Sequence, residues 1–148
     1  MRSLNSMLDE YAQSHQNRFN QIIHKFCVPT IMFSILGLLW SIPALDSMKP
    51  NLNWAALTAL FVMFYYFILS RKYFIIMIPV IGLMYLGNYF LSQTDYLLVS
   101  SIIVFVISWA FQFWGHKVEG KKPSFLKDLL FLLIGPLWVM KALFNLKD

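Results

Sequence analysis

Three histidines are the residues of this chain best suited to chemistry, and they occupy two polar motifs. His15 and His24 lie in the segment YAQSHQNRFNQIIH, residues 11–24, and His116 lies in FQFWGHKVEGKKP, residues 111–123. Histidine is the commonest metal ligand in proteins and also a proton shuttle near neutral pH. Three histidines with one carboxylate would suit a non-haem iron or zinc site that keeps positions open for O₂ or for an activated water.

Carboxylate and amide side chains accompany the histidines. Glu119 supplies a carboxylate in the second motif. Asn20 lies four residues before His24, and Gln112 lies four residues before His116, so each pair shares one face of a helix. We expect the two amides to orient the metal ligands through hydrogen bonds, because such outer partners fix the ring nitrogens that bind a metal.

The spacing of His15 and His24 requires a break in the helix between them. In one straight helix, residues nine apart lie about 13 Å apart along the axis and on opposite faces, so they could not share an ion. Asn17 is a good N-cap residue for a helix that begins near Arg18. In that arrangement His15 lies in the preceding turn and folds back towards the face that carries Asn20 and His24.

The composition predicts a membrane protein. Of the 148 residues, 59% are hydrophobic and 13% are charged, and the mean hydropathy is +0.62. Soluble domains carry about 25% charged residues. Four uncharged runs each reach the length of about 20 residues that a membrane-spanning helix needs, and they are continuously apolar rather than alternating. We therefore predict an all-α integral membrane protein with four transmembrane helices, over 26–45, 50–70, 73–94 and 96–115.

Two further segments complete the predicted fold. Apolar residues recur at helical spacing over 3–14, which predicts an amphipathic helix on the membrane surface or over the helix ends. The apolar run 129–140 is short for a span and contains Gly135–Pro136. Because proline kinks a helix, we predict a Gly-Pro-broken, bent or re-entrant pair of half-helices over 124–146, with a fifth span as the alternative.

We expect one membrane domain over the whole chain. The first 25 residues are polar and lack the apolar core of a signal peptide, so the N-terminal motif should stay with the mature chain. The domain divides into an interfacial helix with the first motif (1–25), four spans (26–115), and a motif loop with the C-terminal half-helices (116–148).

Cationic residues gather at one end of the predicted spans. This distribution follows the positive-inside rule and places both termini and all three histidines on the cytoplasmic side, in a bacterial inner membrane or the endoplasmic reticulum. The net charge of +5 therefore reflects topology rather than nucleic-acid binding, with a secondary role in attracting anionic lipid or a fatty carboxylate. The cations of this side are Arg2, Arg18, Lys25, Arg71, Lys72, Lys117, Lys121 and Lys122, against Lys49 on the other side.

Several function classes are excluded, and others stay open. Three histidines are too few for the histidine boxes of membrane di-iron desaturases, and the chain has no P-loop, GxGxxG, GxSxG or HExxH motif. One histidine alone would suit a helix end at the lipid headgroups. All three on one membrane face, beside amides, favour a functional site because buried polar groups in membranes are costly.

The two motifs resemble those of the DUF962, or Mpo1-like, membrane proteins. The first motif has the form Y-x3-H-x-N-x2-N-x3-H-x4-P over 11–29, and the second has the form Q-x2-GH-x2-E-x3-P over 112–123. The apolar segment LLFLLIGPLWVMKALF, centred on Gly-Pro, also matches. The resemblance implies an Fe(II)-dependent dioxygenase of fatty acid α-oxidation. Such an enzyme takes a long-chain 2-hydroxy fatty acid and O₂ to a fatty acid one carbon shorter, without 2-oxoglutarate or NAD(P)H.

The resemblance also implies a set of site residues. It places the family's histidines on His15, His24 and His116, and it places an acidic position on Glu119. A zinc-dependent lipid hydrolase that uses Glu119 as its base is the alternative enzyme, and a membrane scaffold or lipid-binding protein is the non-enzymatic alternative. The residues expected to support the ligands or the substrate are Asn17, Asn20, Gln112 and Lys117.

Overall fold

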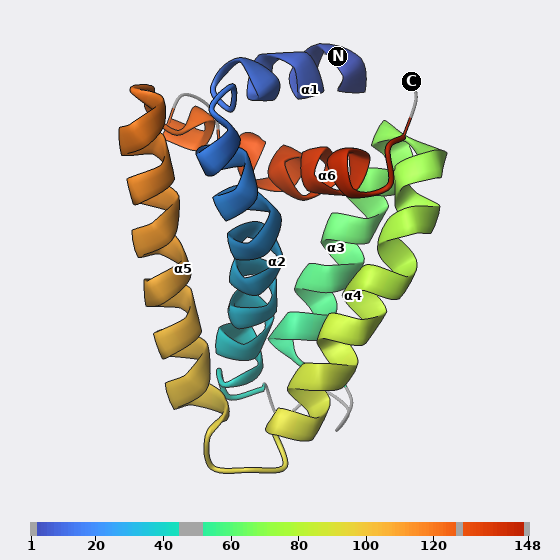
Figure 1. Cartoon of the computed structure of the whole chain (residues 1–148). Coiled ribbons are helices and arrows are strands. Elements are labelled where there is room, and N and C mark those ends of the chain that lie inside the picture. Colours follow the sequence, from blue (N-terminus) through green and yellow to red (C-terminus); the bar gives the residue numbers. More distant parts are fainter. Residues whose placement is uncertain (1–2, 45–51, 127–128, 147–148) are drawn as a thin grey trace. The chain divides into compact units, whose positions relative to one another are not determined.

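The fold consists of helices joined by turns. The computed structural model describes residues 3–44, 52–126 and 129–146, and no strand occurs among them, which confirms the all-α prediction. The helices are α1 (Leu4–Gln13), α2 (Arg18–Trp40), α3 (Trp54–Leu69), α4 (Arg71–Leu91), α5 (Leu97–Glu119), the 3₁₀ helix η1 (Ser124–Leu126) and α6 (Phe131–Leu143) (Figure 1).

Three of the described helices, α2, α4 and α5, are long and apolar enough to cross a membrane, judged by length and composition. The fourth predicted span is represented by α3, which has 16 residues and a length of about 24 Å. Helix α2 begins well before the predicted span, and α5 continues past residue 115 to Glu119. Parts of the predictions lie outside the described residues, namely residues 1–2, 45–51, 127–128 and 147–148, which include Arg2 and Lys49.

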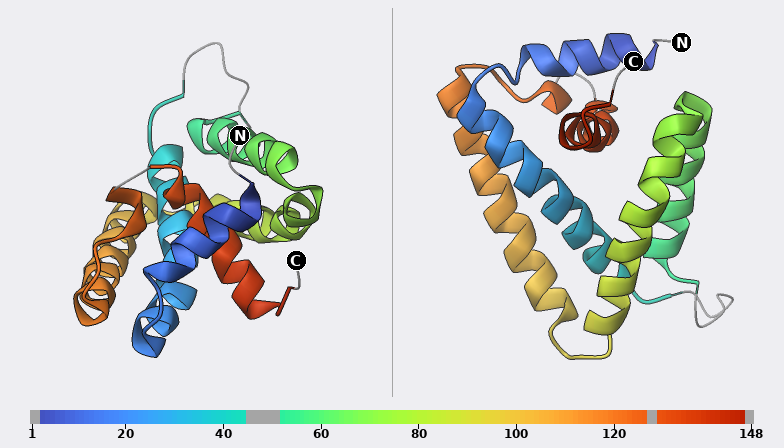
Figure 2. Two further views of the ribbon diagram at one scale, coloured as in Figure 1. Left: turned by 90° about the horizontal axis from the view of Figure 1, so that it is seen from above. Right: turned by 45° about the vertical axis from the view of Figure 1, so that its right-hand side comes forward.

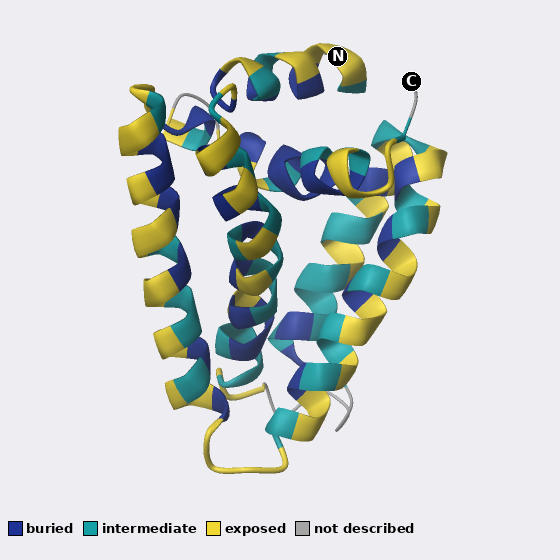
Figure 3. Ribbon diagram, in the orientation of Figure 1, coloured by how far each residue is buried: buried dark blue, intermediate teal, exposed yellow. Residues whose placement is uncertain are grey.

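The distribution of polar and apolar side chains matches a membrane protein. One side of α5 is buried and carries mostly small or polar residues, while large apolar residues face outward (Figure 3). Soluble proteins show the opposite pattern, whereas helix contacts in membranes favour small and polar residues. The buried side of α5 consists of Leu97, Ser101, Ser108, Gln112, Gly115 and His116.

The chain divides into two compact units. The histidine unit comprises Met1–Pro29 with Ile107–Asp148, and the other unit comprises Thr30–Val106. In the second unit, α3 and α4 pack against each other and are joined by Ser70 alone. That both units belong to one membrane domain stays a prediction.

In the histidine unit, α1 crosses α6 (Figure 2). Ser3 caps α1 by accepting a hydrogen bond from the backbone N–H of Ser6 at 3.2 Å. The apolar side of α1 is buried and the rest is mainly polar, which confirms the amphipathic helix predicted over 3–14. The buried residues are Met7, Leu8 and Tyr11.

The predicted break at Gly135–Pro136 is wrong, because α6 runs through both residues as one helix. A Cβ on residue 135 would lie 2.9 Å from the hydroxyl oxygen of Tyr11, so Gly135 provides room for α1 to pack. Pro136 has no N–H and therefore removes one backbone hydrogen bond from the helix, but the φ angle that its ring imposes is close to the helical value. Helix α6 has 13 residues and a length of about 20 Å, and the alternative of a fifth span stays a prediction.

Candidate metal centre

A turn between α1 and α2 positions the first histidine. The side-chain oxygen of Asn17 accepts a hydrogen bond from the backbone N–H of Phe19 at 2.9 Å, and α2 begins at Arg18. Both observations confirm the N-cap that was predicted from the sequence. Because the helix direction changes here, His15 folds back and its ring centroid lies 4.2 Å from that of His24.

The three histidines meet in the histidine unit. The ring centroid of His116 lies 4.9 Å from that of His15 and 4.9 Å from that of His24, and all three rings are nearly perpendicular to one another. One nitrogen of each ring lies within 4.8 Å of the other two, and all three residues are buried. Nitrogens bound to one ion at about 2.1 Å can be at most about 4.2 Å apart, so a small inward movement would let all three bind.

Hydrogen bonds to backbone carbonyls fix the protonation of two rings. Nδ1 of His15 lies 2.6 Å from the carbonyl oxygen of Tyr11, and Nδ1 of His24 lies 2.9 Å from that of Asn20. A carbonyl only accepts, so each Nδ1 carries the hydrogen and each Nε2 keeps its lone pair. Metal-binding histidines are oriented in this way by their second nitrogen.

Two buried nitrogens lack a protein partner. Within the described part of the chain, neither Nε2 of His15 nor Nδ1 of His116 has a hydrogen-bond partner. Leaving a buried polar atom unsatisfied costs about 1–3 kcal/mol. A metal ion between the rings would satisfy both atoms, so the residues present fit a three-histidine metal site.

Aromatic rings cover one side of His15. The Tyr11 ring stacks on the His15 ring, with centroids 4.1 Å apart, and the Trp138 ring of α6 lies 5.2 Å away. Burial lowers the pKa of His15 to about 4, so the ring is neutral at pH 7 and its lone pair is available. Burial also raises the pKa of the Tyr11 phenol. Tyr11 begins the first motif and Trp138 lies in the matched apolar segment, but no role at the site was predicted for either residue.

Glu119 lies outside the group of ligand nitrogens. Its carboxylate accepts hydrogen bonds from the backbone N–H groups of Gln16 and Asn17, both at 2.8 Å. It also accepts one from the side-chain amide of Asn20 at 3.2 Å. Glu119 therefore connects the α1–α2 turn to the end of α5. Asn17 contributes to this connection with its backbone N–H and not with its side chain.

Asn20 connects this turn to the histidines. Its side-chain amide donates to the carbonyl oxygen of Ser14 at 3.3 Å as well as to Glu119. Gly115 lies against it, since a Cβ at 115 would overlap the Asn20 side-chain oxygen. Gly115 therefore permits this close approach, and α5 continues past it to Glu119. Gln112 is buried one helical turn before His116.

The chain is similar to one family of known proteins along most of its length. The family model described as 2-hydroxy-palmitic acid dioxygenase Mpo1-like matches residues 1–146. The protein 2-hydroxy-palmitic acid dioxygenase MPO1 of Saccharomyces cerevisiae is 29% identical over 141 residues, covering 93% of this chain and 77% of the yeast protein. No solved structure matches. The chain therefore belongs to the Mpo1-like family, as the two histidine motifs indicated.

Proposed function

We propose that this protein is an Fe(II)-dependent dioxygenase that converts long-chain 2-hydroxy fatty acids to fatty acids one carbon shorter. The main support for this proposal is the cluster of three buried histidines. In His15 and His24, the hydrogen bond at Nδ1 leaves Nε2 as the atom that can bind a metal. The substrate class comes from the name of the yeast relative. Three nitrogen ligands leave positions open for substrate and O₂.

The reaction balances with O₂ as the only oxidant. The C1–C2 bond breaks, C1 leaves as CO₂, and C2 becomes the carboxyl carbon of the shorter acid. These changes release four electrons, which reduce one O₂, so that one water forms for each shorter acid. No external reductant is needed, in keeping with an enzyme that uses neither 2-oxoglutarate nor NAD(P)H. Bound Fe(II) would supply the one-electron chemistry that O₂ activation requires.

The chain's own groups would hold and shield the metal. Nε2 of His15, Nε2 of His24 and Nδ1 of His116 are the proposed ligands, and the carbonyls of Tyr11 and Asn20 keep two of the rings in the binding tautomer. The stacked Tyr11 ring excludes water from one side of His15.

We also propose that α3 crosses the membrane, giving four spans. The close approach of His24, near the start of α2, to His116, near the end of α5, supports this topology. An even number of crossings brings these two ends to the same side. With only three crossings, the two histidines would be separated by the hydrocarbon thickness of about 30 Å. The positive-inside pattern then favours the cytoplasmic side for this end and both termini.

Exchanging the metal tests the proposal against zinc hydrolysis. The detergent-purified chain would be loaded with Fe(II) or with Zn²⁺ and incubated with 2-hydroxypalmitate in air. We expect mass spectrometry to find pentadecanoic acid only with Fe(II). Equal product with Zn²⁺, or product formed without O₂, would contradict a dioxygenase.

Glu119→Gln separates a positioning role from a catalytic one. Since the Glu119 carboxylate is bound to the α1–α2 turn, we expect iron affinity to fall by about 10- to 100-fold, as for other groups that orient ligands. At saturating Fe(II), kcat should stay within about tenfold of the wild type, whereas loss of a general base typically costs about 10²- to 10⁴-fold. The exposed acid Asp9 provides the control variant Asp9→Asn. A large fall in kcat at saturating metal would make Glu119 catalytic.

A further inference from the structure

His116 lines an open pocket of about 290 Å³ in the histidine unit. This volume is at the low end for ligand pockets, which measure about 300–1,000 Å³. It suits the head of a lipid-like molecule rather than the whole of a long acyl chain. The other lining residues are Phe113, Lys117, Gly120, Lys121, Lys122 and Pro123.

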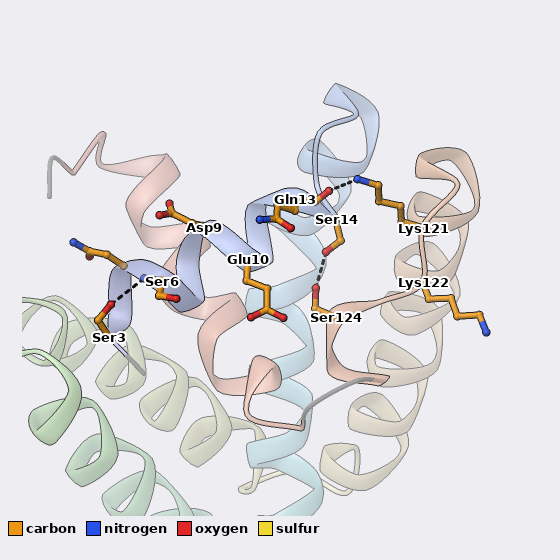
Figure 4. A pocket seen from close by; sticks show the side chains of 10 residues that line it. Ser3, Ser6, Asp9, Glu10, Gln13, Ser14, Lys121, Lys122 and Ser124 are labelled. Carbon is orange, nitrogen blue, oxygen red and sulfur yellow. Dashed lines mark hydrogen bonds between the residues drawn. The ribbon is translucent and has the colours of Figure 1, made fainter. Parts of the chain in front are cut away.

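The rim of this pocket is cationic. Three lysines line it, and none of the described residues that line it is acidic. The nearby carboxylate of Glu119 is held by the backbone N–H groups of Gln16 and Asn17. Lys121 is fixed, because its ammonium donates to the carbonyl oxygen of Gln13 at 2.6 Å, and Lys122 extends away from that bond (Figure 4). An anion would therefore meet positive charge beside His116.

Lys117 is the lysine specific to this pocket. Lys121 and Lys122 also line a larger polar pocket of about 970 Å³ beside α1, which Asp9 and Glu10 line as well (Figure 4). Lys117 is exposed and does not line that second pocket. A lysine of this kind keeps its ammonium in water while its stem lies along apolar surface.

The other wall of the His116 pocket is apolar. Phe113 lies one helical turn before Lys117 on α5, and its side chain is 51% exposed. Pro123, which follows the end of α5, also lines the pocket. The pocket thus pairs a cationic rim with an apolar wall. An amphiphilic anion matches this pattern, with its charged head at the lysines and the start of its chain along Phe113.

We propose that Lys117, assisted by Lys122 and Lys121, binds the carboxylate of the fatty acid substrate in this pocket, so that the protein takes 2-hydroxy fatty acids as free anions rather than as neutral esters. This inference rests on the proposed function and names the group that recognises its substrate. A charged hydrogen bond to a carboxylate is stronger than a neutral one, so the ionised acid is bound in preference to its methyl ester.

The test uses the whole 148-residue chain in an uncharged detergent. The affinity of the Fe(II)-loaded chain for 2-hydroxypalmitate and for its methyl ester is measured without O₂ by calorimetry, and KM and kcat are then measured in air. Lys117→Gln and Lys117→Gln with Lys122→Gln are compared with Lys25→Gln, which makes the same charge change on α2. Lys117→Arg keeps the charge and should restore binding.

We expect Lys117→Gln to weaken binding of the acid and to raise KM by about tenfold, the effect of losing one charged hydrogen bond. Binding of the ester, iron content and kcat should change less than about twofold, since the lysine contacts the carboxylate and not the metal. Lys25→Gln should behave as wild type. If both lysine variants bind the acid as tightly as wild type, the inference is wrong. The inference is also wrong if the substitutions weaken binding of phosphatidylglycerol and leave binding of the acid unchanged, since the lysines then bind lipid phosphate.

The same measurements separate this inference from the proposed function. Lysine-dependent binding of the acid without turnover by the wild type would support the carboxylate site and contradict the dioxygenase. Normal turnover with an unchanged KM in the lysine variants would support the dioxygenase and contradict the carboxylate site.

Discussion

Replacing His24 with alanine is expected to abolish stable iron binding and to lower O₂-dependent turnover by more than about 100-fold. Loss of a group that only orients a ligand costs about 10- to 100-fold, and removal of one of three ligands must cost more. His24→Gln keeps much of the side-chain volume but lacks the imidazole, so it should fail equally. His15→Ala and His116→Ala should give the same result, because each ring supplies one of the three converging nitrogens.

The measurements are iron per chain by elemental analysis, turnover of 2-hydroxypalmitate, and helicity by circular dichroism. We expect unchanged helicity, because the helices of the histidine unit pack through residues such as Met7, Leu8 and Ile134 and not through the rings alone. Gln93→Ala changes a residue in an exposed turn and is the control, since it should keep the iron content and turnover of the wild type. A folded His24→Ala protein that keeps its iron and its turnover would contradict the assignment of the site.

Gly115→Ala is expected to weaken iron binding by about 10- to 100-fold, the range for loss of an outer partner, although residue 115 binds no metal itself. The added methyl group would overlap the side-chain oxygen of Asn20. Asn20 would have to move, and its backbone carbonyl orients His24 while its side chain holds Glu119. A substitution that usually strengthens a helix would therefore disturb the site.

Gly82→Ala is the matched control. A Cβ at residue 82 meets nothing within 4 Å, so this variant should gain about 1 kcal/mol of helix propensity and keep its iron affinity. Combining Gly115→Ala with Asn20→Ala removes the overlapping oxygen, so the two effects on iron affinity should not add. An iron titration of each variant checks these expectations. Wild-type affinity in Gly115→Ala would show that this contact does not position His24.

Much of the site was predictable because it depends on short-range sequence patterns and on the number of membrane spans. The N-cap at Asn17 and the apolar spacing of α1 are short-range patterns, and the structure has both features. The meeting of His24 with His116 was expected from the four predicted spans, because an even number of crossings returns the chain to the same side. Neither inference needs knowledge of side-chain packing.

The remaining features depend on contacts between segments distant in sequence. The two backbone donors that bind Glu119 lie more than 100 residues away from it, and a motif cannot distinguish this arrangement from a catalytic carboxylate. Trp138 reaches His15 only because α6 packs under α1. The Gly135–Pro136 pair suggested a break, whereas Gly135 accommodates Tyr11, a partner that local sequence does not reveal.

We propose that three histidines hold an iron at which O₂ alone oxidises a 2-hydroxy fatty acid. The most direct test follows O₂ consumption and pentadecanoic acid together, with the purified Fe(II)-loaded protein, 2-hydroxypalmitate and no added reductant. We expect one molecule of the shorter acid for each O₂ consumed, and neither O₂ consumption nor product formation in His24→Ala. Iron-loaded wild-type protein that binds 2-hydroxypalmitate but consumes no O₂ would contradict this proposal.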